Sequence, residues 1–197
     1  MKNDQLRELL YQALETELGG VEVYQTAITC ASNRDLKKEW ERYLEQTNHH
    51  VEVVRGVLEA FDLNPDAMTP GRGIVRMNGR TLVKLMQKAQ ASGDREAAQL
   101  VAAECVVTAE TKDNQNWALL EECGKKLNGA VKSVIEAAVG EVKPAEDEQL
   151  YHSQGWVREL WIKSLGMKAV LPPPEEKRDV KTAIGAARAR QAREQLM

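Results

Sequence analysis

The chain has 197 residues, of which 43% are hydrophobic and 29% are charged, and its formal net charge is -3. About two-thirds of the surface of an unfolded chain of this length can be buried, so the sequence can build a sizeable core. Because the net charge is small and both signs are mixed along the chain, we expect neither a nucleic acid nor a membrane as partner. The composition is rich in good helix formers, which favours an all-helical fold.

The three cysteines, Cys30, Cys105 and Cys123, lie inside helical patterns and show no Cys-x-x-Cys spacing. An odd number of cysteines without a pairing pattern favours a reducing compartment. The N-terminal residues open an amphipathic pattern and lack the continuous apolar segment of a signal peptide or membrane span. We therefore expect a cytoplasmic protein.

The first half of the chain predicts two long helices joined by a short polar turn. The first runs over about 4–31, because Asp4 is a good N-cap, and the second over about 36–61. So short a connection makes the two helices antiparallel neighbours. Residues 62–80 contain two prolines and three glycines, which predicts a long irregular crossover followed by a short helix over 81–91.

The second half predicts two more long helices and an appendage. A third helix is expected over 95–127, and a fourth in two parts, 130–142 and 145–165, because Pro144 kinks or breaks it. Three consecutive prolines then form a stiff linker into a basic terminal segment. We therefore divide the chain into a helical domain, 1–166, and a Pro-rich linker with a helical tail, 167–197.

Polar residues interrupt the apolar stripe of each long helix near its middle. A helix turns about 100° per residue, and a buried carboxylate is costly unless it is paired or metal-bound. Glu17 and Glu110 lie at the centres of the first and third stripes, and His50 lies at the edge of the second. On the fourth helix Glu146 and Gln149 face inward. His152 is placed towards the rim of the same stripe.

This arrangement resembles the ferritin-like carboxylate proteins over residues 4–165. Their pattern is a Glu on one helix and Glu-x-x-His on the next, repeated in the second half of the bundle. The matching positions here are Glu17, Thr47-x-x-His50, Glu110 and Glu146-x-x-Gln149. The wider set includes ferritins, rubrerythrins, manganese catalases and bacterial stress proteins of the YciE type, and segments 44–52 and 97–104 look most like the last.

The resemblance implies an antiparallel four-helix bundle with a long crossover between its second and third helices and a C-terminal extension. It also implies a metal site that reacts iron or manganese with dioxygen or peroxide. Thr47 stands where the family has a bridging Glu, and Gln149 where it has a His. Three carboxylates and one imidazole suit a single divalent ion, Fe or Mn in the first place and Zn as a further option. A second ion would bind more weakly, because it would rely on Asn114, which lies on the third apolar stripe, on Gln149 or on waters.

Several alternatives stay open at this point. Glu17 and Glu110 could instead pair with inward Arg or Lys side chains. A competing ligand register would use Glu45 with His49 and Glu148 with His152, each pair spaced i, i+4. The whole bundle could also be a non-catalytic stress or interaction protein with a degraded metal site. The tail could dock on a larger assembly, and we expect a homodimer or larger homo-oligomer.

Overall fold

The computed structural model describes residues 3–196, and the elements in that range are helical. They are α1 (Asn3–Cys30), α2 (Arg34–Ala60), α3 (Pro70–Ala91), α4 (Arg95–Gly124), α5 (Gly129–Ser164), α6 (Pro174–Lys177) and α7 (Ala183–Gln191), followed by a 3-10 turn (Ala192–Leu196). The described range contains no strand, so the all-helical prediction is confirmed. None of its helices is both long and apolar enough to cross a membrane.

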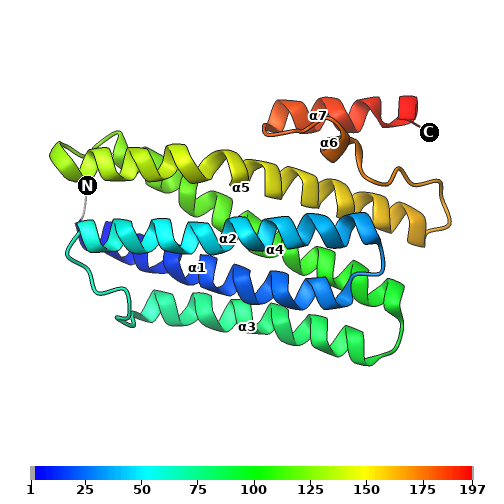
Figure 1. The fold of residues 1–197 in the computed structure, drawn as a ribbon, viewed down its shortest axis with the longest axis horizontal. Helices are drawn as coiled ribbons and strands as arrows, with labels where there is room; N and C mark the ends of the chain where they lie inside the picture. The colour runs from blue at the N-terminus through cyan, green and yellow to red at the C-terminus, as the bar shows by residue number, and fades with distance from the viewer. Residues whose placement is uncertain (1–2, 197) are drawn as a thin grey trace.

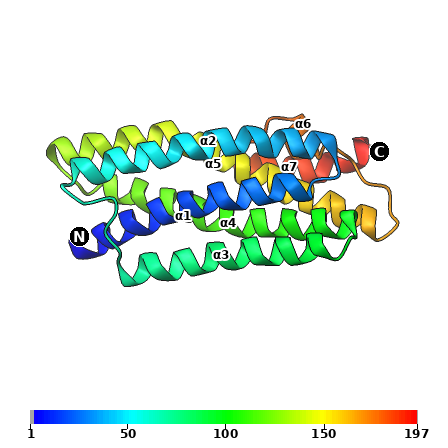
Figure 2. The ribbon, with the colours of Figure 1, turned by 60° about the horizontal axis from the view of Figure 1, so that its bottom comes forward.

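The five long helices lie side by side along the length of the molecule (Figures 1 and 2). Helix α1 contacts α2 and α4, and α5 contacts the same two helices, so these four close a ring. Helix α3 packs on the outside of this ring against α1 and α4. It runs parallel to α1, because its early Arg72 pairs with Glu15 and the carbonyl of its later Met86 contacts Cys30.

Helix α3 corrects the prediction that residues 62–80 form an irregular crossover. The helix begins at Pro70, where a proline costs little because the first helical N–H has no partner within the helix. Thr69 caps it by accepting a hydrogen bond from the N–H of Arg72. Gly79 faces α1, and a Cβ added there would lie 3.5 Å from the Cα of Gly19. The glycines therefore serve close packing of two helices.

Helix α5 corrects the prediction of a break at Pro144, because the helix is continuous through that residue. An interior proline removes one hydrogen bond and crowds the carbonyl four residues earlier, at a cost of about 3 kcal/mol. The carbonyl in question belongs to Gly140, which carries no side chain. Buried side chains on both sides of the proline, Val142 and Glu146 among them, hold the two halves of α5 in line.

The core consists of two apolar clusters. Leu10, Leu14, Leu58, Trp117 and Val142 belong to the first cluster. Tyr24, Trp40, Tyr43, Val106 and Trp156 belong to the second. On each of α1, α2, α4 and α5 the segment between the two clusters carries buried polar side chains. The polar residues of the four helices therefore lie at one level between two dry regions.

The tail that the sequence offered as a docking helix for another molecule packs on α5 of its own chain. Arg158 of α5 donates hydrogen bonds of 2.6 and 2.8 Å to the two carboxylate oxygens of Glu175 in α6. The indole N–H of Trp156 donates to Glu176. The backbone N–H of Val170 donates to Glu159 of α5. These contacts place the tail beside α5, and the domain division after residue 166 stays a prediction.

Candidate metal centre

Six polar side chains from the four helices of the ring form a layer between the two apolar clusters, which we call the polar layer. It consists of Glu17 (α1), His50 (α2), Glu110 and Asp113 (α4), and Glu146 and Gln149 (α5). Each of these residues is at most 4% exposed. Ionisable side chains buried to this degree are rare unless they are paired or bind a metal.

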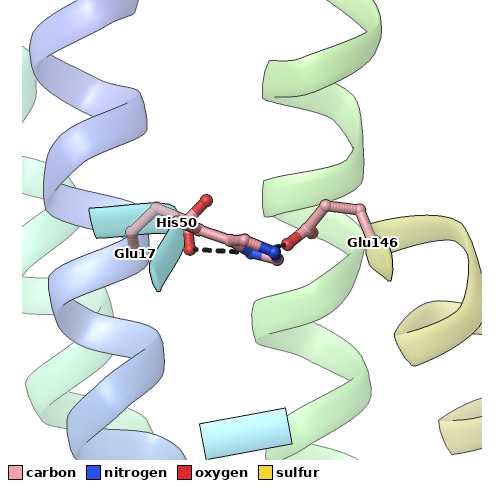
Figure 3. A group of neighbouring side chains, drawn as sticks. All are labelled: Glu17, His50 and Glu146. Carbon is pink, nitrogen blue, oxygen red and sulfur yellow. Dashed lines mark ion pairs between the residues drawn. The ribbon is translucent and has the colours of Figure 1, made fainter. Parts of the chain in front are cut away.

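The histidine lies between two of the carboxylates. His50 Nδ1 is 2.8 Å from Glu146 Oε1 and 3.7 Å from Glu17 Oε2 (Figure 3). One ligand atom from each of these three residues lies within 4.8 Å of the other two. Because the residues come from three different helices, a cation bound among them would be held from three sides. The three side chains have the geometry to hold a metal ion.

Aromatic side chains fix two carboxylates of the layer through one oxygen each. The indole N–H of Trp117 donates to Glu17 Oε1 at 2.9 Å, and the hydroxyl of Tyr24 donates to Glu110 Oε1 at 2.8 Å. The second oxygen of each carboxylate has no hydrogen-bond partner. A hydrogen bond to one oxygen thus orients each glutamate and leaves its other oxygen available. Hydrogen bonds orient the ligand carboxylates of metal sites in the same way.

The layer contains one buried atom without a hydrogen-bond partner on each of its six residues. These atoms are Glu17 Oε2, His50 Nδ1, Glu110 Oε2, Asp113 Oδ1, Glu146 Oε2 and Gln149 Oε1. Although His50 Nδ1 is close to Glu146, the pair is not aligned as a hydrogen bond. More than nine in ten buried polar groups have a partner, and each orphan costs about 1–3 kcal/mol. Five oxygens and one imidazole nitrogen form a donor set that fits a divalent cation.

Burial and mutual repulsion favour the protonated carboxylic acids in this layer. Burial, followed by the charge of Glu146, raises the pKa of Glu110 well above its ordinary value. Burial and the charge of Glu17 likewise raise the pKa of Asp113 well above its ordinary value and that of Glu146 to about 7. Burial opposes the charge on His50, but contact with Glu146 and Glu17 outweighs it and raises the pKa to about 10. Protons thus neutralise the layer when no other cation does.

Within residues 3–196, no arginine or lysine neutralises the layer, because the ion pairs of its carboxylates are those that Glu17 and Glu146 make with His50. The alternative that Glu17 and Glu110 pair with inward Arg or Lys side chains is therefore wrong. Four carboxylic groups share one imidazole, and a bound cation would offset this charge imbalance.

Asp113 is the site residue that the sequence prediction missed. Asn114 was placed on the inward stripe of α4, but it is only partly buried and donates a 2.7 Å hydrogen bond to Asp147. Asp113 is buried and its carboxyl interacts with Glu17, Glu146 and Glu110. The usable signal was its spacing, because a residue three positions after Glu110 lies on the same face of the helix.

The two positions that depart from the ferritin-like pattern differ in what they contribute. Gln149 is fully buried in the layer, where its Nε2 donates to Gln46 Oε1 at 2.9 Å and its Oε1 is unpartnered. It therefore offers an amide oxygen. Thr47 donates its hydroxyl hydrogen to the carbonyl of Tyr43 at 2.9 Å. A Cβ added to Gly20 would lie 3.2 Å from the Thr47 methyl group, so this methyl group faces α1. Thr47 supplies no ligand oxygen in this arrangement.

His152 lies in a separate group with Glu39 and Glu148, and it is buried rather than at the rim as predicted. Its Nδ1 is 3.1 Å from the hydroxyl of Tyr43 and 3.3 Å from Glu39 Oε1. These three residues also have the geometry to hold a metal ion. Arg42, however, contacts both carboxylates at 2.5 Å. Because an arginine already neutralises this group, its chemistry suits a cation less well than that of the polar layer.

The competing set of ligands, Glu45 with His49 and Glu148 with His152, is wrong for its two residues on α2. Glu45 and His49 are exposed, and His49 Nε2 lies 2.7 Å from Glu141 Oε1 at the surface. On α5 the same register places Glu148 and His152, which are buried but belong to the arginine-paired group. The register therefore does not bring its two histidines together.

Comparison of the chain with protein families, with curated proteins and with solved structures found no match. The site therefore has to be interpreted from its own residues.

Proposed function

We propose that this chain is a ferritin-like metal-binding protein that holds a divalent ion in the polar layer. In this proposal α1, α2, α4 and α5 are the four helices of the bundle, and α3 is a fifth helix built into the crossover. The observation that supports it best is the set of six buried ligand atoms without a hydrogen-bond partner at one level of four helices. Hydrogen bonding within the chain does not satisfy these atoms, whereas one cation with its waters would.

Glu17, His50 and Glu146 are the primary ligands in this proposal, because their ligand atoms are the closest together. Two carboxylates balance the charge of one divalent ion. Glu110, Asp113 and Gln149 complete the coordination or hold waters. Carboxylate oxygens with one imidazole suit Fe and Mn first and Zn as a further option.

The chemistry that we infer is metal handling, with slow oxidation of a redox-active ion rather than rapid turnover. Iron or manganese bound here would supply the redox chemistry with dioxygen or peroxide. A dinuclear centre requires bridging carboxylates, and the hydroxyl of Thr47 is engaged by the backbone of its own helix. The aromatic residues that surround the layer keep water out and hold Glu17 and Glu110 in place.

The test is metal binding by variants of two adjacent histidines. Elemental analysis of protein purified without chelators would give the native metal, and calorimetric titration of the stripped protein with Fe(II), Mn(II) and Zn(II) would give stoichiometry and affinity. We expect about one tightly bound ion per chain. His50→Ala should weaken binding by 10- to 100-fold or more, as loss of site residues typically does. His49→Ala is the matched control, because His49 is exposed and points to Glu141.

Equal losses in the two histidine variants would contradict the proposal, as would the absence of specific binding of any of the three ions. Tight binding of two ions with fast Fe(II) oxidation would overturn the inference about Thr47 while leaving the site itself in place.

A further inference from the structure

A groove of about 350 Å³ lies between α1, α3 and α4, and none of the six residues of the polar layer lines it. Its walls are mainly apolar. Gly19 and Gly79, which line its floor, place no side chain in it. Its volume falls within the range of small-molecule sites, about 300–1,000 Å³. The groove is thus large enough for a ligand of modest size.

The directions of the three helices give the groove one polar end and one apolar end. Helix α3 runs parallel to α1, whereas α4 is antiparallel to α1, because Asn116 bonds to Thr16 and Glu110 bonds to Tyr24. Glu15, Thr16 and Lys112 consequently meet at one end. Val23, Leu82 and Ala109 meet at the other, beside Thr81 and Thr108, whose hydroxyls donate to carbonyls of their own helices. An amphipathic ligand has only one favourable orientation between such ends.

The polar end is lined by one carboxylate, Glu15, and one ammonium group, Lys112. The carboxylate of Glu15 is already neutralised by Arg72 at 2.7 Å and by Arg76 at 2.6 Å, neither of which lines the groove. The Nζ of Lys112 donates to Asn116 Oδ1 at 2.5 Å, and within residues 3–196 the charge of the neighbouring Asp113 acts on it without forming an ion pair. The ammonium group therefore keeps hydrogen-bond capacity for an incoming anion.

We propose that this groove binds an unbranched aliphatic carboxylic acid, with its carboxylate on Lys112 and its chain extending towards Val23 and Leu82. The ammonium supplies a charge-assisted hydrogen bond, and the apolar walls remove methylene groups from water. The aliphatic chain passes over the glycine floor.

This site is separate from the metal proposal although it lies next to the polar layer. Thr16 precedes Glu17 in α1, and Lys112 precedes Asp113 in α4. Neighbouring residues of a helix point about 100° apart, so the groove and the layer use different faces of the same two helices. Binding of the acid is consequently expected in metal-free protein.

The experiment is calorimetric titration of chelator-treated full-length protein with saturated acids from butanoate to dodecanoate. Each buried methylene should lower the dissociation constant about fourfold, until the chain outgrows the groove and the affinity levels off. Octanol, which has the same chain without the charge, should bind more weakly than octanoate.

Variants at two groove positions and one control locate the site. Lys112→Met should weaken octanoate binding roughly 10-fold or more and leave octanol binding unchanged. Ala109→Phe should abolish binding of both, and Ala109→Leu provides a smaller filler in case the larger one disturbs folding. Lys88→Met is the control, since Lys88 is exposed on α3 and does not line the groove. Thermal melts by circular dichroism establish that each variant is folded.

Affinity that does not depend on chain length would overturn the proposal. So would octanoate binding that survives both Ala109 variants, or a loss in Lys88→Met as large as that in Lys112→Met. None of these outcomes bears on metal binding, which the histidine variants test independently.

Discussion

Replacement of Glu146 by Gln should stabilise the metal-free protein. Burial and the charge of Glu17 raise the pKa of Glu146 from 4.5 to about 7. At 1.36 kcal/mol per pKa unit, keeping this carboxylate ionised in the folded protein costs about 3 kcal/mol. A carboxyl group whose pKa is raised on folding lowers the stability of the folded protein only at pH values at which the group is ionised in the unfolded chain. The penalty is therefore absent below about pH 4.5 and fully present above pH 7.

The expected gain for Glu146→Gln at pH 8 is consequently below about 3 kcal/mol in free energy of unfolding, because the substitution also removes one ion-pair partner of His50, while Glu17 remains beside it. The gain falls to about zero at pH 4. The same substitution at Glu148 is the matched control, two residues further along α5. Arg42 and Lys181 pair with Glu148 at 2.5 and 3.2 Å. Its carboxylate is buried while both cations are partly exposed, so Glu148→Gln removes two favourable ion pairs and should lose about 1 kcal/mol.

Urea denaturation followed by circular dichroism, with chelator present at both pH values, measures these differences. A second series with excess Mn(II) tests function, because an ion at 100 times its dissociation constant stabilises the folded protein by about 2.7 kcal/mol. The wild type should show that gain and Glu146→Gln should not. Destabilisation of metal-free Glu146→Gln at pH 8, or stabilisation of Glu148→Gln, would refute the electrostatic reasoning about the polar layer.

Three further predictions concern the missed ligand and the tail. Asp113→Asn should weaken metal binding roughly 10-fold or more, whereas Asn114→Ala should leave it unchanged, as calorimetry would show. Burial, and then the charge of Glu39, raises the pKa of Glu176 to about 7, so its contribution to tail docking is present below pH 4.5 and lost as the pH rises through 7. The hydrogen-exchange protection factors of residues 174–191, which correct for the base catalysis of exchange itself, should therefore decrease between pH 6 and 8, and Glu176→Gln should remove that decrease. A Cβ at Gly155 would lie 2.5 Å from a carboxylate oxygen of α6, so Gly155→Val should detach the tail and speed its proteolysis at every pH, while the melting of the main helices stays in place.

The four ring helices were predictable because their apolar stripes are long and regular. Leu6, Leu10 and Leu14 repeat at four-residue intervals on α1, and burial of all three follows directly from that period. The failures came from residues whose local preference is overridden by packing. Pro70 and Gly79 each have a low helix propensity. In the structure Pro70 stands in the first turn of α3, and Gly79 packs against α1, which is distant in sequence. Oligomeric state and cellular compartment stay predictions.

The helical repeat predicted on which face of its helix each site residue lies, but not the exact direction of its side chain. The central positions of Glu17 and Glu110 followed from their stripes, and both are buried. Asp113 and Asn114 are adjacent on α4, and either could face the interior. Deciding between them requires the rotation of α4 about its own axis, which the sequence does not give. The burial of His152 depends on Glu39 and on the tail, neither of which a helical stripe on α5 reveals.

The position of the polar layer between two apolar clusters also determines how the four ring helices align along their axes. Apolar stripes alone tolerate sliding, because one leucine replaces another after each turn. If α1 moved by one turn, about 5.4 Å, Glu17 would leave Trp117 and enter the level of leucines or of tyrosines above or below it. A carboxylate in those surroundings would lose its partners, so the displaced arrangement is penalised by several kcal/mol. The residues that we propose to hold a cation therefore also fix the alignment of the four helices along their axes.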